Sequence, residues 1–293
     1  MTRANQNDDS ANASSVDVIN QYVQCYVAFL DILGFTAIVN KCEERPEVFK
    51  TLAGLTAVTA KMQKGMKETK YGKCPMQTRA FSDSIVIFTP VSPIGDYEKD
   101  PVFQLLFYVR HIHDKILELD TILRGGIAIG KMYWNPDWNR PKPNTSMPIT
   151  FGRGVIDAYR LESGEGSGKN DKEHWQPCIR LSDEIVARFD KDDANAHPFA
   201  EDYDNTALKT FVRKDANDGF YFLDIMHRRV LRRSSERVRA SSNGFAIYSE
   251  GNNSHGSIVE KYENLIAMHM NSESDAVKKK YQWIKDYIKS CNA

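Results

Sequence analysis

The sequence has no surplus charge, no long apolar run and few cysteines. Its 293 residues balance 39 lysines and arginines against 39 aspartates and glutamates, so no overall field favours nucleic acid or an anionic membrane. No apolar run reaches the length of a transmembrane helix, and the start, MTRANQNDDSANASS, lacks the apolar region of a signal peptide. The five cysteines are odd in number and form no CxxC pair, unlike a disulfide framework or a zinc site. We therefore expect a soluble, cytoplasmic protein with reduced thiols that binds neither nucleic acid nor membrane.

Composition divides the chain into three parts. Residues 1–20 are polar and rich in Asn, Ser and Asp, which predicts a disordered tail. Residues 21–250 alternate between strand and helix patterns, and we expect them to form the main domain. Residues 251–293 have the amphipathic pattern of a helical extension, which we expect to pack on that domain or on a partner.

The order of patterns in the main domain predicts its fold class. Apolar and β-branched runs predict strands near 22–30, on both sides of a turn within 77–90, and at 123–134. Helical spacing predicts helices within 35–69, where Pro46 interrupts the pattern, across 101–120, and after a turn within 149–163. This order favours an α/β (α+β) fold with flanking helices, in which neighbouring strands are antiparallel around a central hairpin.

Two acids stand alone in apolar segments. Asp31 interrupts YVAFLDILGFTAIV, and Asp83 lies at the turn of the hairpin in QTRAFSDSIVIFTP. One interpretation of Asp31 is an N-cap for a helix that starts near Leu33. If the hairpin instead pairs beside the first strand, both carboxylates meet at one edge of the sheet, where a cation must relieve their repulsion. Two hard oxygen ligands suit Mg²⁺ or Mn²⁺, and the Leu33, Gly34 and Phe35 amides would bind a polyphosphate at the start of the helix.

Four motifs in this order, FLDILGFT, FSDSIVIF, LRGGIAIG and FGRGVIDAYRLE, resemble those of class III nucleotidyl cyclases. The resemblance covers about residues 24–165. It implies a cyclase-type fold, with a mainly antiparallel sheet, flanking helices and a ferredoxin-like core. It also implies two divalent ions, Mg²⁺ or Mn²⁺, held by Asp31, Asp83 and the Ile32 carbonyl. The ribose 3′-hydroxyl of a nucleoside triphosphate then attacks the α-phosphorus, giving a 3′,5′-cyclic nucleotide and pyrophosphate.

The same resemblance gives Arg160 a catalytic role. In VIDAYR, Arg160 takes the place of the family's arginine that stabilises charge on the α-phosphoryl group. The alternative is a solvated helix arginine paired with Asp157 or Glu162. The family's asparagine four residues earlier is Ile156 here, so the ribose must be positioned in another way. In the family, the metal acids and the base reader for one nucleotide come from different subunits, which implies a head-to-tail homodimer with composite sites.

The positions that select the base depart from the purine pattern. Adenylyl cyclases of this class have a lysine four residues before the second metal aspartate and an acid shortly before the last motif. Here these positions hold Arg79 and either Ile149 or Thr150, so nothing accepts a hydrogen bond from the amino group of adenine. Arg79 carries only donors, whereas uracil presents two carbonyl acceptors. The pattern favours UTP over CTP; the alternatives are a cyclic-AMP-forming purine cyclase, and an Arg79 that merely pairs with a surface acid.

A cyclase without a sensor domain and with a non-purine pocket is most similar to the pyrimidine cyclases of bacterial Pycsar anti-phage systems. There, cyclic UMP or cyclic CMP activates a separate effector protein, so the resemblance implies such a partner. Two interpretations from other classes remain open. A polymerase-like or diguanylate-type palm domain shares the two-acid hairpin, although FSDSI lacks a GGDEF-like turn. A catalytically silent nucleotide sensor would keep the binding residues and signal through its C-terminal helix.

Overall fold

The computed structural model describes residues 22–44, 76–91, 101–117, 120–134, 150–164, 176–190, 212–215, 219–224, 255–271 and 274–292. The strands are β1 (Tyr22–Ile32), β2 (Gln77–Phe81), β3 (Ser84–Pro90), β4 (Leu123–Tyr133), β5 (Ile179–Leu181), β6 (Val212–Lys214) and β7 (Tyr221–Leu223). The helices are α2 (Phe35–Glu44), α4 (Val102–Leu117), α5 (Arg153–Ser163), α6 (Asp183–Asp190), α9 (His255–Met270) and α10 (Asp275–Asn292). The predicted tail, residues 1–20, lies outside the described residues.

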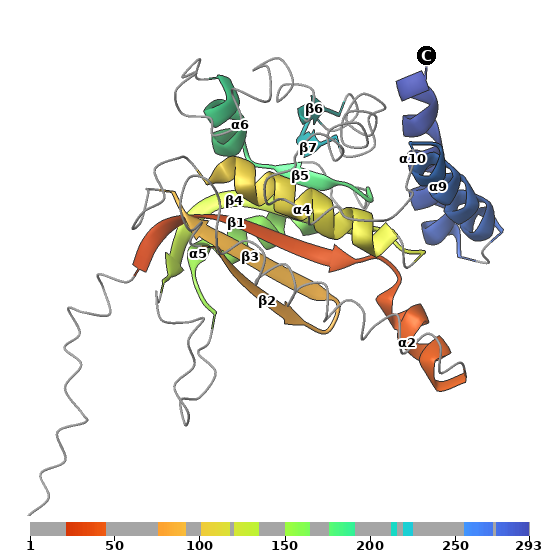
Figure 1. Ribbon diagram of the computed structural model, residues 1–293, viewed down its shortest axis with the longest axis horizontal. Helices are drawn as coiled ribbons and strands as arrows, with labels where there is room; N and C mark the ends of the chain where they lie inside the picture. Colours follow the sequence, from red (N-terminus) through yellow and green to blue (C-terminus); the bar gives the residue numbers. More distant parts are fainter. Residues whose placement is uncertain are drawn as a thin grey trace, which may run out of the picture.

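The described strands form one seven-stranded sheet in the order β2-β3-β1-β4-β5-β7-β6. Neighbouring strands are antiparallel except β4 and β5, which are parallel. This confirms the predicted mixed α/β class, with a mostly antiparallel sheet and flanking helices (Figure 1). The β2–β3 hairpin forms one edge of the sheet and not its centre, because β1 pairs with β3 on one side and with β4 on the other.

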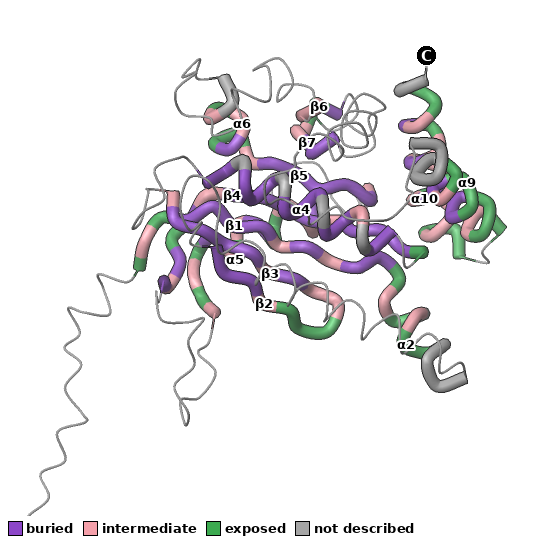
Figure 2. The backbone as a smooth tube through the Cα atoms, in the orientation of Figure 1, coloured by how far each residue is buried: buried purple, intermediate pink, exposed green. Residues whose placement is uncertain are grey.

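Residues of β1 alternate between two apolar cores. Tyr26 and Leu30 lie in the larger core, which includes the buried face of α4, whereas Cys25 and Val27 lie in a smaller core with Ala158 of α5. Successive strand residues point to opposite faces, so α4 and α5 cover opposite sides of the sheet (Figure 1). Burial is concentrated in these central strands, while the tip of the β2–β3 hairpin is exposed (Figure 2). Each fully buried side chain of this size contributes about 1.5–3 kcal/mol.

Glycines in β4 allow α5 to pack directly on the strand backbone. A Cβ atom added at Gly126 would lie 2.1 Å from the Ala158 carbonyl oxygen, and one at Gly130 would lie 2.4 Å from the Gly154 Cα atom. Glycine at these two positions leaves room for the backbone of α5 to approach the strand this closely. The helix ends at Gly164, whose φ of 77° is the left-handed conformation that stops a helix. These contacts fix how deeply α5 sits over the sheet.

The C-terminal helices α9 and α10 share the larger core with the sheet. Tyr262 and Ile284 are buried in it, and the Tyr262 hydroxyl lies 3.1 Å from His113 Nε2 on α4. Tyr287 of α10 donates a hydrogen bond to the buried Asp224, which follows β7. The helical pattern predicted within 251–293 is therefore confirmed, and these helices pack on the other elements of the chain. None of the described helices is both long enough and apolar enough to cross a membrane.

Candidate functional site

The turn of the β2–β3 hairpin brings Asp83 beside the end of β1. The turn has two residues, and Ser82 adopts a φ of 55°, the positive value that such turns use at their first position. Across the next pair of strands, Asp31 is in register with Ser84, and the Ile32 amide donates to the Asp83 carbonyl at 3.0 Å. The two acids singled out from the sequence are therefore neighbours at one end of the sheet.

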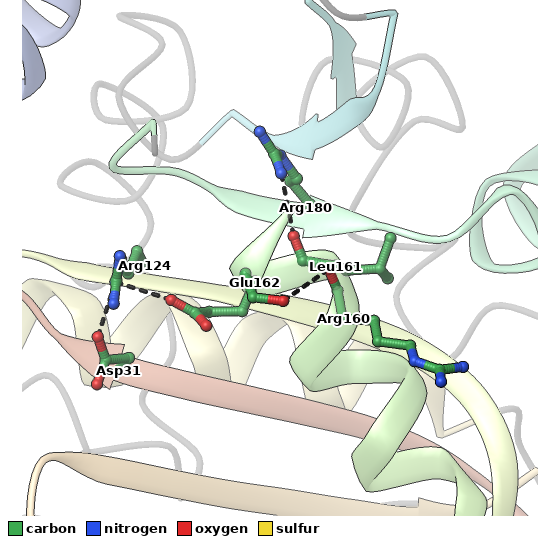
Figure 3. Close-up of polar contacts among 7 residues, drawn as sticks. Asp31, Arg124, Arg160, Leu161, Glu162 and Arg180 are labelled. Atoms are coloured by element: carbon green, nitrogen blue, oxygen red, sulfur yellow. Dashed lines mark hydrogen bonds and ion pairs between the residues drawn. The ribbon is translucent and has the colours of Figure 1, made fainter. Parts of the chain in front are cut away.

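Asp31 also has a cationic partner that the motifs did not indicate. Arg124 is in register with Asp31 across β1 and β4, and its Nε donates to Asp31 Oδ2 at 2.7 Å. The same Nε lies 2.8 Å from Glu162 Oε1 on α5 (Figure 3). The Asp31, Arg124 and Glu162 side chains are 14%, 20% and 5% exposed, so solvent screens this group weakly. Asp31 lies within β1 and α2 begins at Phe35, so the N-cap interpretation of Asp31 is wrong.

Burial and charge act in opposite directions on these side chains. Burial raises the pKa of Asp31, Arg124 lowers it through its hydrogen bond and its charge, and Asp83 raises it. Burial also raises the pKa of Glu162, against the lowering effect of Arg124. Burial and then repulsion from Arg124 lower the pKa of Lys280 on α10, while Asp31 and Glu162 raise it. Cations from β4 and α10 thus offset the mutual repulsion of the acids.

The start of α2 offers fewer amides to an anion than the sequence suggested. The Leu33 amide donates to the Ile122 carbonyl at 2.9 Å, so it is already engaged at the end of the sheet. Gly34 has a φ of 76° and turns the chain from β1 into α2, and Phe35 is the first helical residue. Leu33 is therefore not an available phosphate-binding amide, which leaves Gly34 and Phe35. Ile32, predicted to give a carbonyl ligand, is the last residue of β1.

Arg160 extends away from Asp31. Its side chain is 47% exposed, and Figure 3 shows it pointing away from Asp31. The Arg160 Nη1 atom lies 3.9 Å from Asp157 Oδ1, which is the ion pair considered for a solvated helix arginine. Ile156, at the position of the family's asparagine, is also exposed. Within one chain, the two acids lie together and Arg160 points away from Asp31.

Arg79 and Thr150, the two candidates for base recognition that the structure describes, lie far apart along the strand direction of the sheet. Arg79 on β2 is in register, through β3 and β1, with Gly126 of β4. Thr150 lies beside the far end of β4, where the carbonyl of the next residue accepts from the Tyr133 amide at 3.1 Å. From Gly126 to Tyr133 the strand advances by about 23 Å, at about 3.3 Å per residue. Thr150 therefore does not share a pocket with Arg79 in one chain, and Ile149 lies outside the described residues.

Arg79 lies on the α5 side of the sheet, since side chains in register on antiparallel strands share a face. Its row continues through Val86 to Phe29, whose ring meets that of Tyr159 edge-on with centroids 5.4 Å apart. The Arg79 Nη1 donates to the Thr78 carbonyl at 3.0 Å. Burial lowers the pKa of Arg79 to about 10, so the side chain remains a cation at neutral pH.

Large apolar side chains on the same side are exposed. Phe81 is 85% exposed, and its register with Ser84 puts it on the same face as Asp31. Ile156 and Tyr159 of α5 are 48% and 45% exposed. We call Phe81, Ile156 and Tyr159 the α5-side apolar group. Phe81 is in register with Asp31 through Ser84, and Tyr159 contacts Phe29 in the row of Arg79.

Within the described ranges, no three His, Cys, Asp or Glu side chains are grouped so as to hold a metal ion. A metal ion at Asp31 and Asp83 would therefore take its other ligands from backbone, substrate or water oxygens. No protein-family model matches the chain, and no curated protein sequence matches it.

Proposed function

We propose that this protein is a class III-type nucleotidyl cyclase that converts UTP to 3′,5′-cyclic UMP and pyrophosphate. The observation that carries the proposal is the meeting of Asp31 and Asp83 where β1 adjoins the hairpin turn. Asp83 raises the pKa of Asp31, and a divalent cation between the two would reverse that effect by favouring the ionised form. Paired acids at the end of a sheet are suited to two-metal chemistry on phosphates.

The strand order supports a ferredoxin-like core of the cyclase type. The elements β1, α2, β2, β3, α4 and β4 follow one another as β-α-β-β-α-β. Their strands lie side by side as β2-β3-β1-β4, with every neighbouring pair antiparallel. A core of two interleaved, split βαβ units would have this strand order, which supports the proposal. In the proposal, these elements are the catalytic core, and β5, β7 and β6 extend the sheet beyond it.

The residues at the acid pair fit a divalent ion. The Asp31 Oδ2 atom is bonded to Arg124, which leaves the other oxygen for a metal. Asp83 and the Ile32 carbonyl add hard oxygen atoms, the ligands that Mg²⁺ and Mn²⁺ prefer. When bound, the ions would supply positive charge to the triphosphate and lower the pKa of the ribose 3′-hydroxyl.

The remaining roles fall to residues that hold phosphates and the base. The Gly34 and Phe35 amides, at the positive end of α2, are proposed to bind the terminal phosphates. The 3′-hydroxyl gives its proton to solvent water, its oxygen forms a bond to the α-phosphorus as the bond to pyrophosphate breaks, and Arg160 neutralises charge on the α-phosphoryl oxygens. Arg79 donates to the uracil carbonyls, whereas cytosine would turn an amino donor towards it. We leave Thr150 out of base recognition because of its distance from Arg79.

We also propose that the active unit is a head-to-tail homodimer. Arg160 extends away from Asp31 of its own chain, so a second chain is needed to bring an Arg160 side chain to the acids (Figure 3). The α5-side apolar group gives such a contact an apolar surface to bury. In a closed twofold pair, each protomer supplies its acids to one site and Arg160 with Arg79 to the other.

The test is turnover of the purified protein with ATP, GTP, CTP or UTP and Mn²⁺, followed by mass spectrometry of the nucleotide and measurement of pyrophosphate. Cyclic UMP is expected, and Asp31→Ala and Asp83→Ala should abolish it. Asp275→Ala is the matched control, because the Asp275 side chain is 90% exposed at the start of α10. The metal assignment fails if either acid variant keeps near wild-type turnover.

A catalytically silent nucleotide sensor is the second candidate. Two observations favour it: Asp31 already has a cationic partner in Arg124, and Ile156 replaces the family's asparagine. Such a sensor would bind UTP, as measured by calorimetry, and release no pyrophosphate with any nucleotide or metal. The turnover experiment therefore separates the two candidates directly.

A further inference from the structure

Asp31 lies between side chains of opposite charge. On one side, β4 contributes Arg124, whose Nε donates to Asp31 Oδ2 at 2.7 Å. On the other side, β3 contributes Ser84 in register with Asp31, directly after Asp83 in the turn. A carboxylate has two oxygens, and the bond to Arg124 engages one of them on the β4 side. The second oxygen is left for the side on which Asp83 lies.

Arg124 does not interact with Asp31 only, because Glu162 shares its positive charge. Its Oε1 atom lies 2.8 Å from the same Arg124 Nε, and its side chain is 5% exposed. Arg124 and Lys280 of α10 offset two of the three negative charges of Asp31, Glu162 and Asp83, and Arg180 acts on Glu162. Asp83 still raises the pKa of Asp31, and a divalent cation between the two carboxylates would relieve their repulsion.

We propose that Arg124, held by Glu162, is a positioning residue that fixes the Asp31 carboxylate for metal binding. This inference rests on the proposed function, since it assumes that Asp31 is a metal ligand. The guanidinium is planar and its donors have fixed directions, so it orients a carboxylate more strictly than an ammonium group does. Ligating carboxylates are commonly held by such outer partners, whose loss lowers metal affinity by about 10–100-fold.

The arrangement also ties the metal site to the helix that carries Arg160. Arg124 belongs to β4, Asp31 to β1 and Glu162 to α5, so one guanidinium joins three elements (Figure 3). Arg180 of β5 holds the same end of α5, because its Nη1 donates to the Leu161 carbonyl at 3.2 Å. The last turn of α5 is therefore fixed relative to Asp31.

The opposite role for Arg124 predicts the opposite result. If Arg124 were only a cation competing for Asp31, its removal would leave more negative charge and Mn²⁺ would bind more tightly. If Arg124 positions Asp31, its removal frees the carboxylate to rotate and Mn²⁺ binds more weakly. The direction of the change in affinity distinguishes the two roles.

The experiment measures Mn²⁺ binding to the full-length protein by the electron paramagnetic resonance signal of free Mn²⁺, with thermal melting as a check on folding. The variants are Arg124→Gln, Glu162→Gln and the double variant, and each is expected to lower the affinity by about 10–100-fold. The double variant removes both partners of the buried pair, which disturbs folding less than removing one. Arg153→Gln is the matched control, because Arg153 Nε forms a 2.8 Å ion pair with Asp157 on the same helix, away from Asp31.

A folded double variant with wild-type Mn²⁺ affinity would overturn the inference, as would tighter binding by Arg124→Gln. Equal losses in Arg153→Gln would also overturn it, since the effect would then be general to ion pairs of α5. The proposed function is judged separately on the wild-type protein. If that protein binds Mn²⁺ and forms cyclic UMP while the Arg124 and Glu162 variants behave normally, only the positioning role fails. If it binds no Mn²⁺, both proposals fail.

Discussion

Mixing two inactive variants tests whether each catalytic site is built from two chains. Asp31→Ala removes a proposed metal ligand, and Arg160→Ala removes the proposed transition-state arginine. In one protomer these side chains point apart (Figure 3). If a second chain brings them together, a heterodimer of the two variants contains one site with both defects and one site with neither.

The size of the recovery follows from the geometry of a twofold dimer. Random exchange of equal amounts makes about half of the dimers heterodimers, each with one intact site of two, so about a quarter of wild-type turnover is expected. The background is small, because an arginine supplied in trans to a phosphoryl transfer is worth about 10³–10⁵ in rate. A quarter of wild-type activity is thus far above either variant alone.

A second mixture provides the control. Asp31→Ala and Asp83→Ala both damage the acid half of a site, so every site of their heterodimer lacks one acid and no recovery is expected. Both mixtures are assayed with UTP and Mn²⁺ after subunit exchange has been verified by native mass spectrometry of chains with different tags. The composite-site model is refuted if heterodimers form and the Asp31 and Arg160 mixture stays inactive, or if a monomer turns over at full rate.

Three further predictions concern specificity, packing and pH. Arg79→Ala should lose the preference for UTP over ATP, up to about 10⁴-fold, while keeping its Mn²⁺ affinity; competition assays with mixed nucleotides measure this, and an unchanged preference contradicts the role. Gly126→Ala should lower the free energy of unfolding by about 1–3 kcal/mol or more, because its Cβ would meet the Ala158 carbonyl at 2.1 Å. Gly34→Ala should lower the free energy of unfolding, measured in urea, by only about 1–2 kcal/mol. A Cβ at Gly34 would meet no atom within 4 Å, but its φ of 76° is unfavourable for alanine. In EDTA, the melting temperature should fall as pH rises through the raised pKa of Asp31, because the folded state holds that proton more tightly than the unfolded state. Asp31→Asn should reduce this dependence, and an unchanged slope would contradict it.

The proximity of Asp31 to Asp83 was predictable from the sequence, whereas the ion pair of Asp31 with Arg124 was not. A strand pattern followed closely by Gly34 and a two-residue hairpin turn each identify an end of the sheet, and both signals are local. Arg124 meets Asp31 across a separation of 93 residues, and only the register of β1 with β4 determines that contact. The signal was nevertheless present: Arg124 is the one charged residue in the LRGGIAIG strand segment. Aligning that segment antiparallel to β1 with Ile32 opposite Leu123 puts it beside the acid.

The distance between Arg79 and Thr150 illustrates a different limit. Motif spacing counts residues along the chain, but the two positions belong to opposite ends of the sheet. Thr150 is held near the end of β4 by the backbone bond from Tyr133 to the following residue, and by the stacking of the Tyr133 and Phe151 rings at 5.1 Å. Neither interaction has a signature in composition or periodicity. The Leu33 amide was misassigned for a similar reason, since its partner, Ile122, lies far along the chain.

The buried contacts of α9 and α10 impose an order on the synthesis of this protein. Both helices follow every described strand in the chain, yet Tyr262 is stacked on His113 of α4 and Tyr287 is bonded to Asp224. A ribosome therefore makes the whole sheet before it makes the helices that complete the core, and domains fold as units during synthesis. Until α10 has emerged, the surfaces of α4 and β7 that receive these helices are open to other nascent chains. Chaperones would therefore bind this chain mainly at that stage, after the sheet has been synthesised and before α9 and α10 cover these surfaces.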